Sequence, residues 1–347
     1  GAFLQLQKGD TNNRTDTQSN TNGSSSNQKS SSLFRDTDTG AVQSLKPSYI
    51  KDTQKRVFRQ DGNGLLLNIH MTGGQEMTMC HRYRQVLTAP PIGCMGIKGQ
   101  GAQEWKQTEP SLANYLATKQ VPWQHADTGK FIATLLPHYR FVMQNFGDSV
   151  NALPNENEYH VQANENGQRI PLSATNWEHP QLVSVLVMMD PMQRLVLGSD
   201  SIDKEFGPVA TRTRDQWWAY AQQTKSKYNR HSHRTDNFWI HLLSEKRNPP
   251  CCTGATTDRI HLQAAKDLLE RFTYLVDHAC LNASLEAMAG ELLSNGEALP
   301  ADPQPAGPWP SPRDQIGHED IYNFLVQQNQ LDIELYEWVK QQAIVKC

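Results

Sequence analysis

Two apolar runs along the chain are each followed by a turn and a helix-like pattern. The first covers residues 65–70 and ends at Met-Thr-Gly-Gly, positions 71–74, after which residues 75–83 can be helical. The second covers residues 182–189 and ends at Asp-Pro, with helical character resuming at Met192. A continuous apolar run of this kind is typical of a parallel strand buried on both faces. The pattern predicts an α/β fold with a central parallel sheet, whose ligand binds at the carboxyl ends of the strands.

The last third of the chain has helical periodicity. Residues 261–276 place apolar side chains on one helical face, and residues 283–293 predict a second, shorter helix. A proline-rich segment at 297–312 interrupts the pattern, and residues 321–345 predict one or two amphipathic helices. We therefore expect helices to flank the sheet and to dominate the C-terminal part.

The first 45 residues differ in composition from the rest. Between Lys8 and Ser32 no apolar residue larger than glycine occurs, so this stretch cannot bury enough surface to offset the entropy of ordering it. It contributes much of the low mean hydropathy, −0.65, of the 347-residue chain. We expect a low-complexity polar tail or stalk at residues 1–45 and a single domain at residues 46–347.

Charge and hydropathy argue against two general classes of partner, although the net charge leaves a local basic groove open. Lys plus Arg number 33 and Asp plus Glu 36, and the net charge of −3 gives no overall electrostatic reason to bind nucleic acid or an anionic membrane. No apolar run reaches the length of about 18 residues that a membrane span requires. The sequence therefore predicts no nucleic-acid partner and no membrane span in this chain.

The cysteines and sequons bear on the cellular compartment. Six cysteines occur without the CxxC spacing of zinc sites, so no structural metal is expected. They fit either disulfides in an oxidising compartment or buried free thiols. Asn-X-Ser/Thr sequons, one of them at Asn282, permit glycosylation, and the start at Gly1 without Met is typical of a processed or truncated chain. We expect a secretory-pathway protein in the Golgi lumen, with an imported organelle protein as the alternative.

The Gly-Gly turn at positions 73–74 is the strongest candidate for a ligand site. A turn between a strand and a helix presents backbone N–H groups at the helix N-terminus, and these groups suit phosphate or sulfate. The alternative is a plain tight turn, because Gly-Gly is common in loops.

This turn and a second segment resemble the cofactor motifs of the carbohydrate sulfotransferase family. Residues 69–74, Ile-His-Met-Thr-Gly-Gly, look like that family's first phosphate loop, a strand ending in Pro-Lys-Thr-Gly-Gly. Residues 187–195, Val-Met-Met-Asp-Pro-Met-Gln-Arg-Leu, are similar to its motif Arg-Asp-Pro-x-x-Arg-x-x-Ser, which holds the 3′-phosphate of the cofactor.

Two further segments extend the resemblance toward the end of the chain. Residues 236–244, followed by residues 264–272, are similar to the stretch ahead of the family's late helix. Residues 329–336, Asn-Gln-Leu-Asp-Ile-Glu-Leu-Tyr, are similar to its terminal signature Asn-x-Leu-Asp-x-x-Leu-Tyr. All four segments occur in the family's order.

The resemblance implies both a fold and an activity. The fold would be a P-loop-like sulfotransferase fold, and the activity the transfer of a sulfuryl group from 3′-phosphoadenosine-5′-phosphosulfate (PAPS) to a hydroxyl of a glycan acceptor. The cofactor-binding residues that it implies are Thr72, Gly73, Gly74 and Arg194, together with Ser199 if the alignment of the second motif shifts by two residues. No motif assigns the general base, for which His125, His138 and His179 are candidates.

The chain departs from the family at positions that contact cofactor phosphates. Met71 replaces the loop Lys and Glu76 replaces a hydroxyl residue, while Met189 and Leu197 replace the Arg and Ser of the second motif. Each lost charge-assisted contact costs about 1.5–3 kcal/mol. The alternative is therefore a catalytically inactive, sulfotransferase-like subunit with a structural or binding role in a larger assembly, which contacts protein partners through its N-terminal tail.

Two other clusters have a functional and a structural interpretation. Trp217, Trp218 and Tyr220 could stack on sugar rings, but packing in the core or against a subunit is the favoured interpretation. The His-Ser-His at 231–233, with His241, offers metal ligands, but its basic neighbours favour a solvated loop.

Overall fold

The chain forms two compact units, residues 1–45 and 46–347. The computed structural model describes residues 34–35, 42–43, 47–60, 64–70, 94–96, 128–137, 140–145, 175–197, 200–222, 235–244, 258–293, 299 and 309–347. In the first unit, strands β1 (Phe34–Arg35) and β2 (Val42–Gln43) pair in antiparallel fashion. The remainder of the predicted polar tail lies outside the described residues, and the tail stays a prediction.

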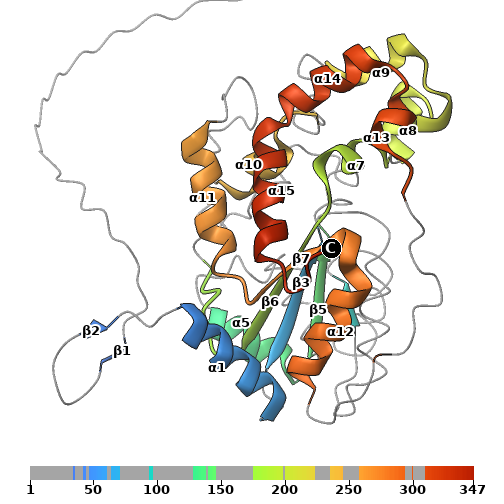
Figure 1. Cartoon of the computed structure of the whole chain (residues 1–347). Helices are drawn as coiled ribbons and strands as arrows, with labels where there is room; N and C mark the ends of the chain where they lie inside the picture. Colours follow the sequence, from blue (N-terminus) through green and yellow to red (C-terminus); the bar gives the residue numbers. More distant parts are fainter. Residues whose placement is uncertain are drawn as a thin grey trace, which may run out of the picture. The chain divides into compact units, whose positions relative to one another are not determined.

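Within the described part of residues 46–347, five strands form a parallel sheet (Figure 1). They are β3 (Leu65–His70), β4 (Cys94–Gly96), β5 (Phe141–Asn145), β6 (Leu182–Met188) and β7 (Tyr274–Asp277). Their order in space is β4-β5-β3-β6-β7, and each neighbouring pair is parallel. The two predicted apolar runs form β3 and β6, which lie side by side. The predicted α/β fold with a central parallel sheet is confirmed.

The sheet is buried on both faces because β6 alternates its side chains between two apolar clusters. Leu182, Leu186 and Met188 belong to one cluster, and Val183, Val185 and Val187 belong to the other. The first cluster includes residues of α5 (Thr128–Leu135), α10 (Phe238–Leu243), α11 (Arg259–Leu269) and α15 (Gln330–Gln342). The second includes residues of α1 (Pro47–Gln60) and α12 (Leu281–Leu292). Helices therefore cover both faces, as a parallel sheet requires.

A group of helices after β6 packs around a third apolar cluster, which includes Trp217 and Tyr220. Its elements are α7 (Pro191–Val196), α8 (Asp200–Phe206), the short 3-10 helix η4 (Val209–Thr211), α9 (Arg214–Ala221), α13 (Pro312–Ile316) and α14 (Glu319–Gln328). Trp217 and Tyr220 are each 1% exposed, and Trp218 packs edge-on against Phe324. The packing interpretation of these three aromatic residues is confirmed.

The helix predicted at residues 261–276 is wrong in its last part. Helix α11 ends at Leu269, the chain turns, and Tyr274–Asp277 form strand β7, which pairs with β6. The four residues of β7 are all buried, and a short apolar run buried in this way fits a helix face as well as a strand. The helices predicted at 283–293 and 321–345 are confirmed as α12 and as the pair α14 and α15.

The residues after α15 return to β7. The backbone N–H of Ile344 donates to the carbonyl of Leu275 at 3.1 Å. Cys347 forms a disulfide with Cys280, which lies in the short 3-10 helix η6 (His278–Cys280) that follows β7. Of the two states left open for the cysteines, disulfide or free thiol, this pair has the disulfide.

None of the described helices combines the length and the apolar character needed to cross a bilayer.

Candidate functional site

The carboxyl ends of β3 and β6 lie where the order of the strands reverses. From β3 the chain continues to β4 and β5 on one side, whereas β6 and β7 lie on the other. Open parallel sheets bind ligands in the crevice outside the strand ends at such a point. His70 at the end of β3 pairs with Val187, so the chain leaves β3 beside the end of β6. Thr72, Gly73 and Gly74 follow directly in sequence, but they and Ser199 lie outside the described residues.

Arg194 on α7 is the predicted cofactor residue that the structure does describe. Its guanidinium lies over the rings of Phe238 and Trp239, at 4.5 and 5.5 Å from the ring centres. Burial lowers the pKa of Arg194, while Asp332 and Tyr220 act in the opposite direction. These contacts join α7 to α10 and α15, and a contact between Arg194 and a phosphate stays a prediction.

Asp332 on α15 is the fully buried acidic partner in this cluster. Its carboxylate accepts the backbone N–H groups of Trp239 and Ile240, both at 2.9 Å. Burial raises the pKa of Asp332 to about 7, against the effects of Arg194 and the two N–H donors. The carboxylate therefore caps the first turn of α10 from a distant helix.

Two asparagines complete the cluster. Asn237, which precedes α10, has the left-handed conformation, with φ 39° and ψ 50°, which asparagine adopts more readily than most residues. Its Oδ1 accepts the backbone N–H groups of Leu331 and Asp332, at 2.9 and 3.1 Å. The side-chain amide of Asn329, which is fully buried, donates to two backbone carbonyls at 2.8 Å.

Three of the four motif-like segments thus meet in one buried cluster. Residues 187–195 contribute Arg194, residues 236–244 contribute the start of α10, and residues 329–336 contribute Asp332. The contacts between them are stacking and capping, and Arg194 and Asp332 also influence each other electrostatically. These signature residues therefore have a structural role that needs no ligand.

The Asp-Pro that follows β6 forms the start of helix α7, with Asp190 as its N-terminal cap. Its carboxylate accepts the backbone N–H groups of Met192 and Gln193, at 2.7 and 3.0 Å, and Pro191 occupies the first turn of α7. The Asp190 carboxylate already accepts the N–H groups of Met192 and Gln193 at the start of this six-residue helix. These N–H groups are therefore not available to bind an anion.

A polar group at the carboxyl end of β7 was not among the predicted site residues. The hydroxyl of Tyr336 donates to Asp277 at 2.8 Å, and the N–H of Ala279 donates to the same oxygen at 3.0 Å. Burial and Asp277 raise the pKa of Tyr336. Burial lowers the pKa of the neighbouring His278, with Asp277 acting in the opposite direction, and this shift favours the neutral imidazole. The signal in the sequence was an Asp-His pair directly after a short apolar run.

The other histidine candidates are not brought to this edge by the described structure. His179 lies at the amino end of β6, where its Nδ1 accepts the backbone N–H of Gln181 at 3.2 Å. His125, His138 and residues 231–233 lie outside the described residues, and His241 lies on α10. In the part of the chain that the structure describes, no three His, Cys, Asp or Glu side chains form a group that could hold a metal ion.

In comparisons with known proteins, the chain matches no family model, no curated protein and no solved structure.

Proposed function

We propose that the chain has a P-loop-like sulfotransferase fold and transfers a sulfuryl group from PAPS to a hydroxyl of a glycan. The observation that carries this proposal is the strand order, which places the end of β3 at the reversal point of the sheet. Residues 72–74 follow that strand, and the meeting of three motif-like segments supports the resemblance from which the activity is inferred.

The chemistry needs an anion cradle and a base. Backbone N–H groups of Thr72, Gly73 and Gly74 would hold the phosphosulfate, and neutral His278 is the candidate general base for the acceptor hydroxyl. The hydroxyl oxygen bonds to sulfur as the bond from sulfur to the bridging phosphate oxygen breaks. The hydroxyl proton passes to the imidazole, and the products are a sulfate ester and adenosine 3′,5′-bisphosphate.

A second function, a catalytically inactive subunit in a larger assembly, is favoured by a specific observation. Asp190 and Arg194, the polar residues kept from the second cofactor motif, both have partners inside the fold. Their retention is therefore explained by packing alone. In this case protein partners would replace PAPS and the glycan.

Location in the secretory pathway belongs to the same proposal. The Cys280–Cys347 disulfide supports it, because structural disulfides persist mainly in oxidising compartments. The sequon at Asn282 adds no support, because it lies in α12 with Ser284 fully buried, whereas glycosylated sequons lie in surface loops.

Calorimetric titration with adenosine 3′,5′-bisphosphate tests the donor site. We expect micromolar binding, lost in Gly73→Asp, which places a carboxylate where the phosphates would lie. The matched control is Gly290→Asp, because Gly290 is exposed on α12 and a side chain there meets nothing within 4 Å. Absence of binding at millimolar ligand would overturn the enzyme proposal, and micromolar binding that Gly73→Asp abolishes would overturn the inactive-subunit alternative.

A further inference from the structure

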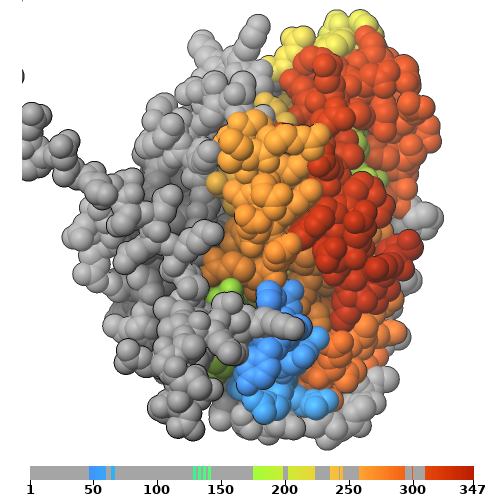
Figure 2. Space-filling view, turned by 60° about the vertical axis from the view of Figure 1, so that its left-hand side comes forward, coloured from blue at the N-terminus to red at the C-terminus, as the bar shows by residue number. Residues whose placement is uncertain are grey.

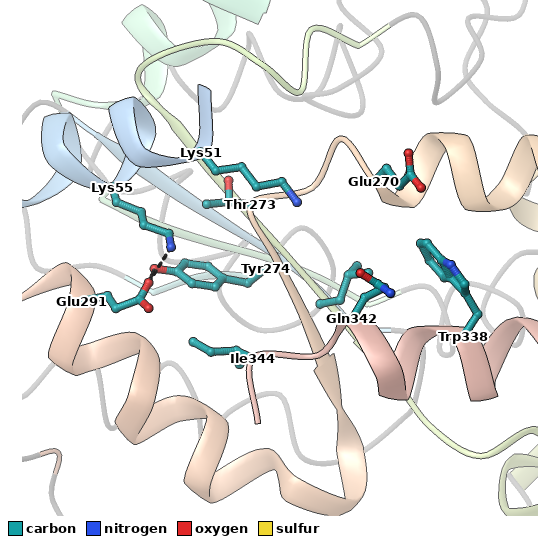
Figure 3. A pocket seen from close by; sticks show the side chains of 10 residues that line it. Lys51, Lys55, Glu270, Thr273, Tyr274, Glu291, Trp338, Gln342 and Ile344 are labelled. Carbon is teal, nitrogen blue, oxygen red and sulfur yellow. Dashed lines mark hydrogen bonds and ion pairs between the residues drawn. The ribbon is translucent and has the colours of Figure 1, made fainter. Parts of the chain in front are cut away.

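A pocket of about 200 Å³ lies at the amino end of β7, away from the edge where the donor is proposed. It is lined by residues of α1, α12 and α15 and by the start of β7 (Figure 3). On the surface, α1 in blue lies close to the orange and red helices of the C-terminal part (Figure 2). Two lysines, Lys51 and Lys55, and two glutamates, Glu270 and Glu291, supply its charges.

One of the two lysines is fully paired. The ammonium of Lys55 lies 2.7 Å from the carboxylate of Glu291, and the hydroxyl of Tyr274 donates to the same oxygen at 2.7 Å. Burial acts to raise the pKa of Glu291, but the bonds from Lys55 and Tyr274 outweigh it and hold this pKa below its usual value. Lys55 also lies over the ring of Tyr274, 5.0 Å from its centre. This trio forms a closed, neutral wall of the pocket.

Lys51, one helical turn earlier on α1, lacks among the described residues a pairing partner of the kind that Lys55 has. In the described part of the chain its ammonium forms no hydrogen bond and no ion pair within 4.0 Å, and the side chain extends toward the part of the pocket near Glu270 and Trp338 (Figure 3). Burial and Lys55 lower the pKa of Lys51, and Glu270 acts in the opposite direction. The side chain is thus a partly desolvated cation without a contacting anion.

The rest of the lining restricts what could supply that anion. Leu275, Trp338 and Ile344 supply apolar side chains to the lining, and Trp338 lies on the side toward which Lys51 extends (Figure 3). Glu270 would repel a second negative charge on the ligand, whereas Glu291 is already neutralised by Lys55. The volume lies below the range of about 300–1,000 Å³ that is usual for drug-sized ligands, so the occupant is small.

We propose that this pocket binds a small monocarboxylate, whose carboxylate pairs with Lys51 and whose compact apolar body packs against the lining near Trp338. The inference rests on the pocket and its charges alone. It is independent of the proposed sulfuryl transfer at the opposite edge of the sheet.

Titration of the full chain with benzoate tests the proposal. We expect saturable binding that is weakened about tenfold or more by Lys51→Met, equivalent to at least about 1.4 kcal/mol, and largely restored by Lys51→Arg. The matched control is Lys204→Met, which removes an exposed lysine of α8 and should leave the affinity unchanged. Unfolding curves of all three variants show whether each one folds, and the arginine variant tests the charge if the methionine variant is unstable.

A comparison of anions makes the test specific. Benzoate should bind more tightly than succinate or inorganic phosphate, and Glu270→Gln should improve succinate binding more than benzoate binding. No saturable binding of benzoate, equal binding to wild type and Lys51→Met, or a preference for the dianions would each overturn the proposal. Because adenosine 3′,5′-bisphosphate is titrated separately, failure at one site is distinguishable from failure at the other.

Discussion

The buried carboxylate of Asp332 accepts the backbone N–H of Trp239 at 2.9 Å, across 93 positions of sequence. A carboxylate in this position costs several kcal/mol unless charges and donors compensate it. The compensation comes from Arg194 and from the first N–H groups of α10. Helix α10 therefore depends on α15 for its capping, and the two segments are expected to order together.

The pH dependence of unfolding tests the state of Asp332. Its pKa in the folded chain, about 7, lies above the ordinary value of 3.8, so the folded state holds the proton more tightly. The stabilisation is fully present below the ordinary value and is lost as the pH rises through about 7, at up to about 1.4 kcal/mol per pH unit. Urea unfolding of wild type and Asp332→Asn over this range measures it. A constant difference in stability between the two proteins at every pH would contradict the assignment.

Arg194→Met should be strongly destabilising even without any cofactor. It removes the cation that offsets the burial of Asp332 and also removes the stacking on Phe238 and Trp239, and losing several interactions of a buried cluster costs at least about 2 kcal/mol. Adding Asp332→Asn to the same chain should recover part of the loss, because the uncompensated charge is then removed. The control is Arg214→Met, which breaks an exposed pair with Asp320 and should cost no more than about 1 kcal/mol. Equal losses in the two single variants would show that Arg194 is not a structural residue.

The Cys280–Cys347 disulfide closes a segment of 67 residues that includes α12 and α15. Chain-entropy arguments give about 4 kcal/mol for a loop of this length. We expect Cys280→Ser to lower the midpoint of thermal unfolding, and the oxidised wild type to lose the same stability when reduced. A Cys280→Ser protein that unfolds at the same temperature as the oxidised wild type would refute this role.

His278→Gln separates catalysis from binding if sulfuryl transfer occurs. A general base typically contributes about 10²–10⁴-fold to the rate, so turnover should fall by that factor. Affinity for adenosine 3′,5′-bisphosphate should stay unchanged, because His278 is assigned to the acceptor. The matched control, His179→Gln, lies at the amino end of β6 and should leave turnover unaffected. If both variants lose turnover equally, His278 is not the base.

Local patterns in the sequence predicted the elements that carry an apolar run or a regular apolar stripe. The apolar runs of β3 and β6 and the stripes of α12, α14 and α15 stand out because their neighbours on the same face are also apolar. Helix α1 was not predicted, since its buried face includes Gln54. The amide of Gln54 bonds to the carbonyls of Trp177 and His179 and to Thr273, and it is fully buried only because these distant partners exist.

The candidate site was harder to predict because its residues, like Gln54, depend on partners that lie far away in the sequence. Composition gave no hint that the Arg194 side chain would lie over Phe238 and Trp239, or that Asp332 would share its surroundings. The resemblance to a family selected Arg194, but its partners come from elements far along the chain. His278 was overlooked because β7, the strand that places it at the carboxyl edge, was predicted as helix.

The bond from Ile344 to Leu275 also affects how this protein behaves beside other copies of itself. An outermost strand with open N–H and carbonyl groups is a template for strand addition, which is a common start of aggregation. On β7 the carbonyl of Leu275 is already engaged from within the chain, and the nearby disulfide keeps residues 343–347 close to that strand. A foreign strand would have to displace this segment before it could extend the sheet at β7, so the residues after α15 guard this edge against strand addition.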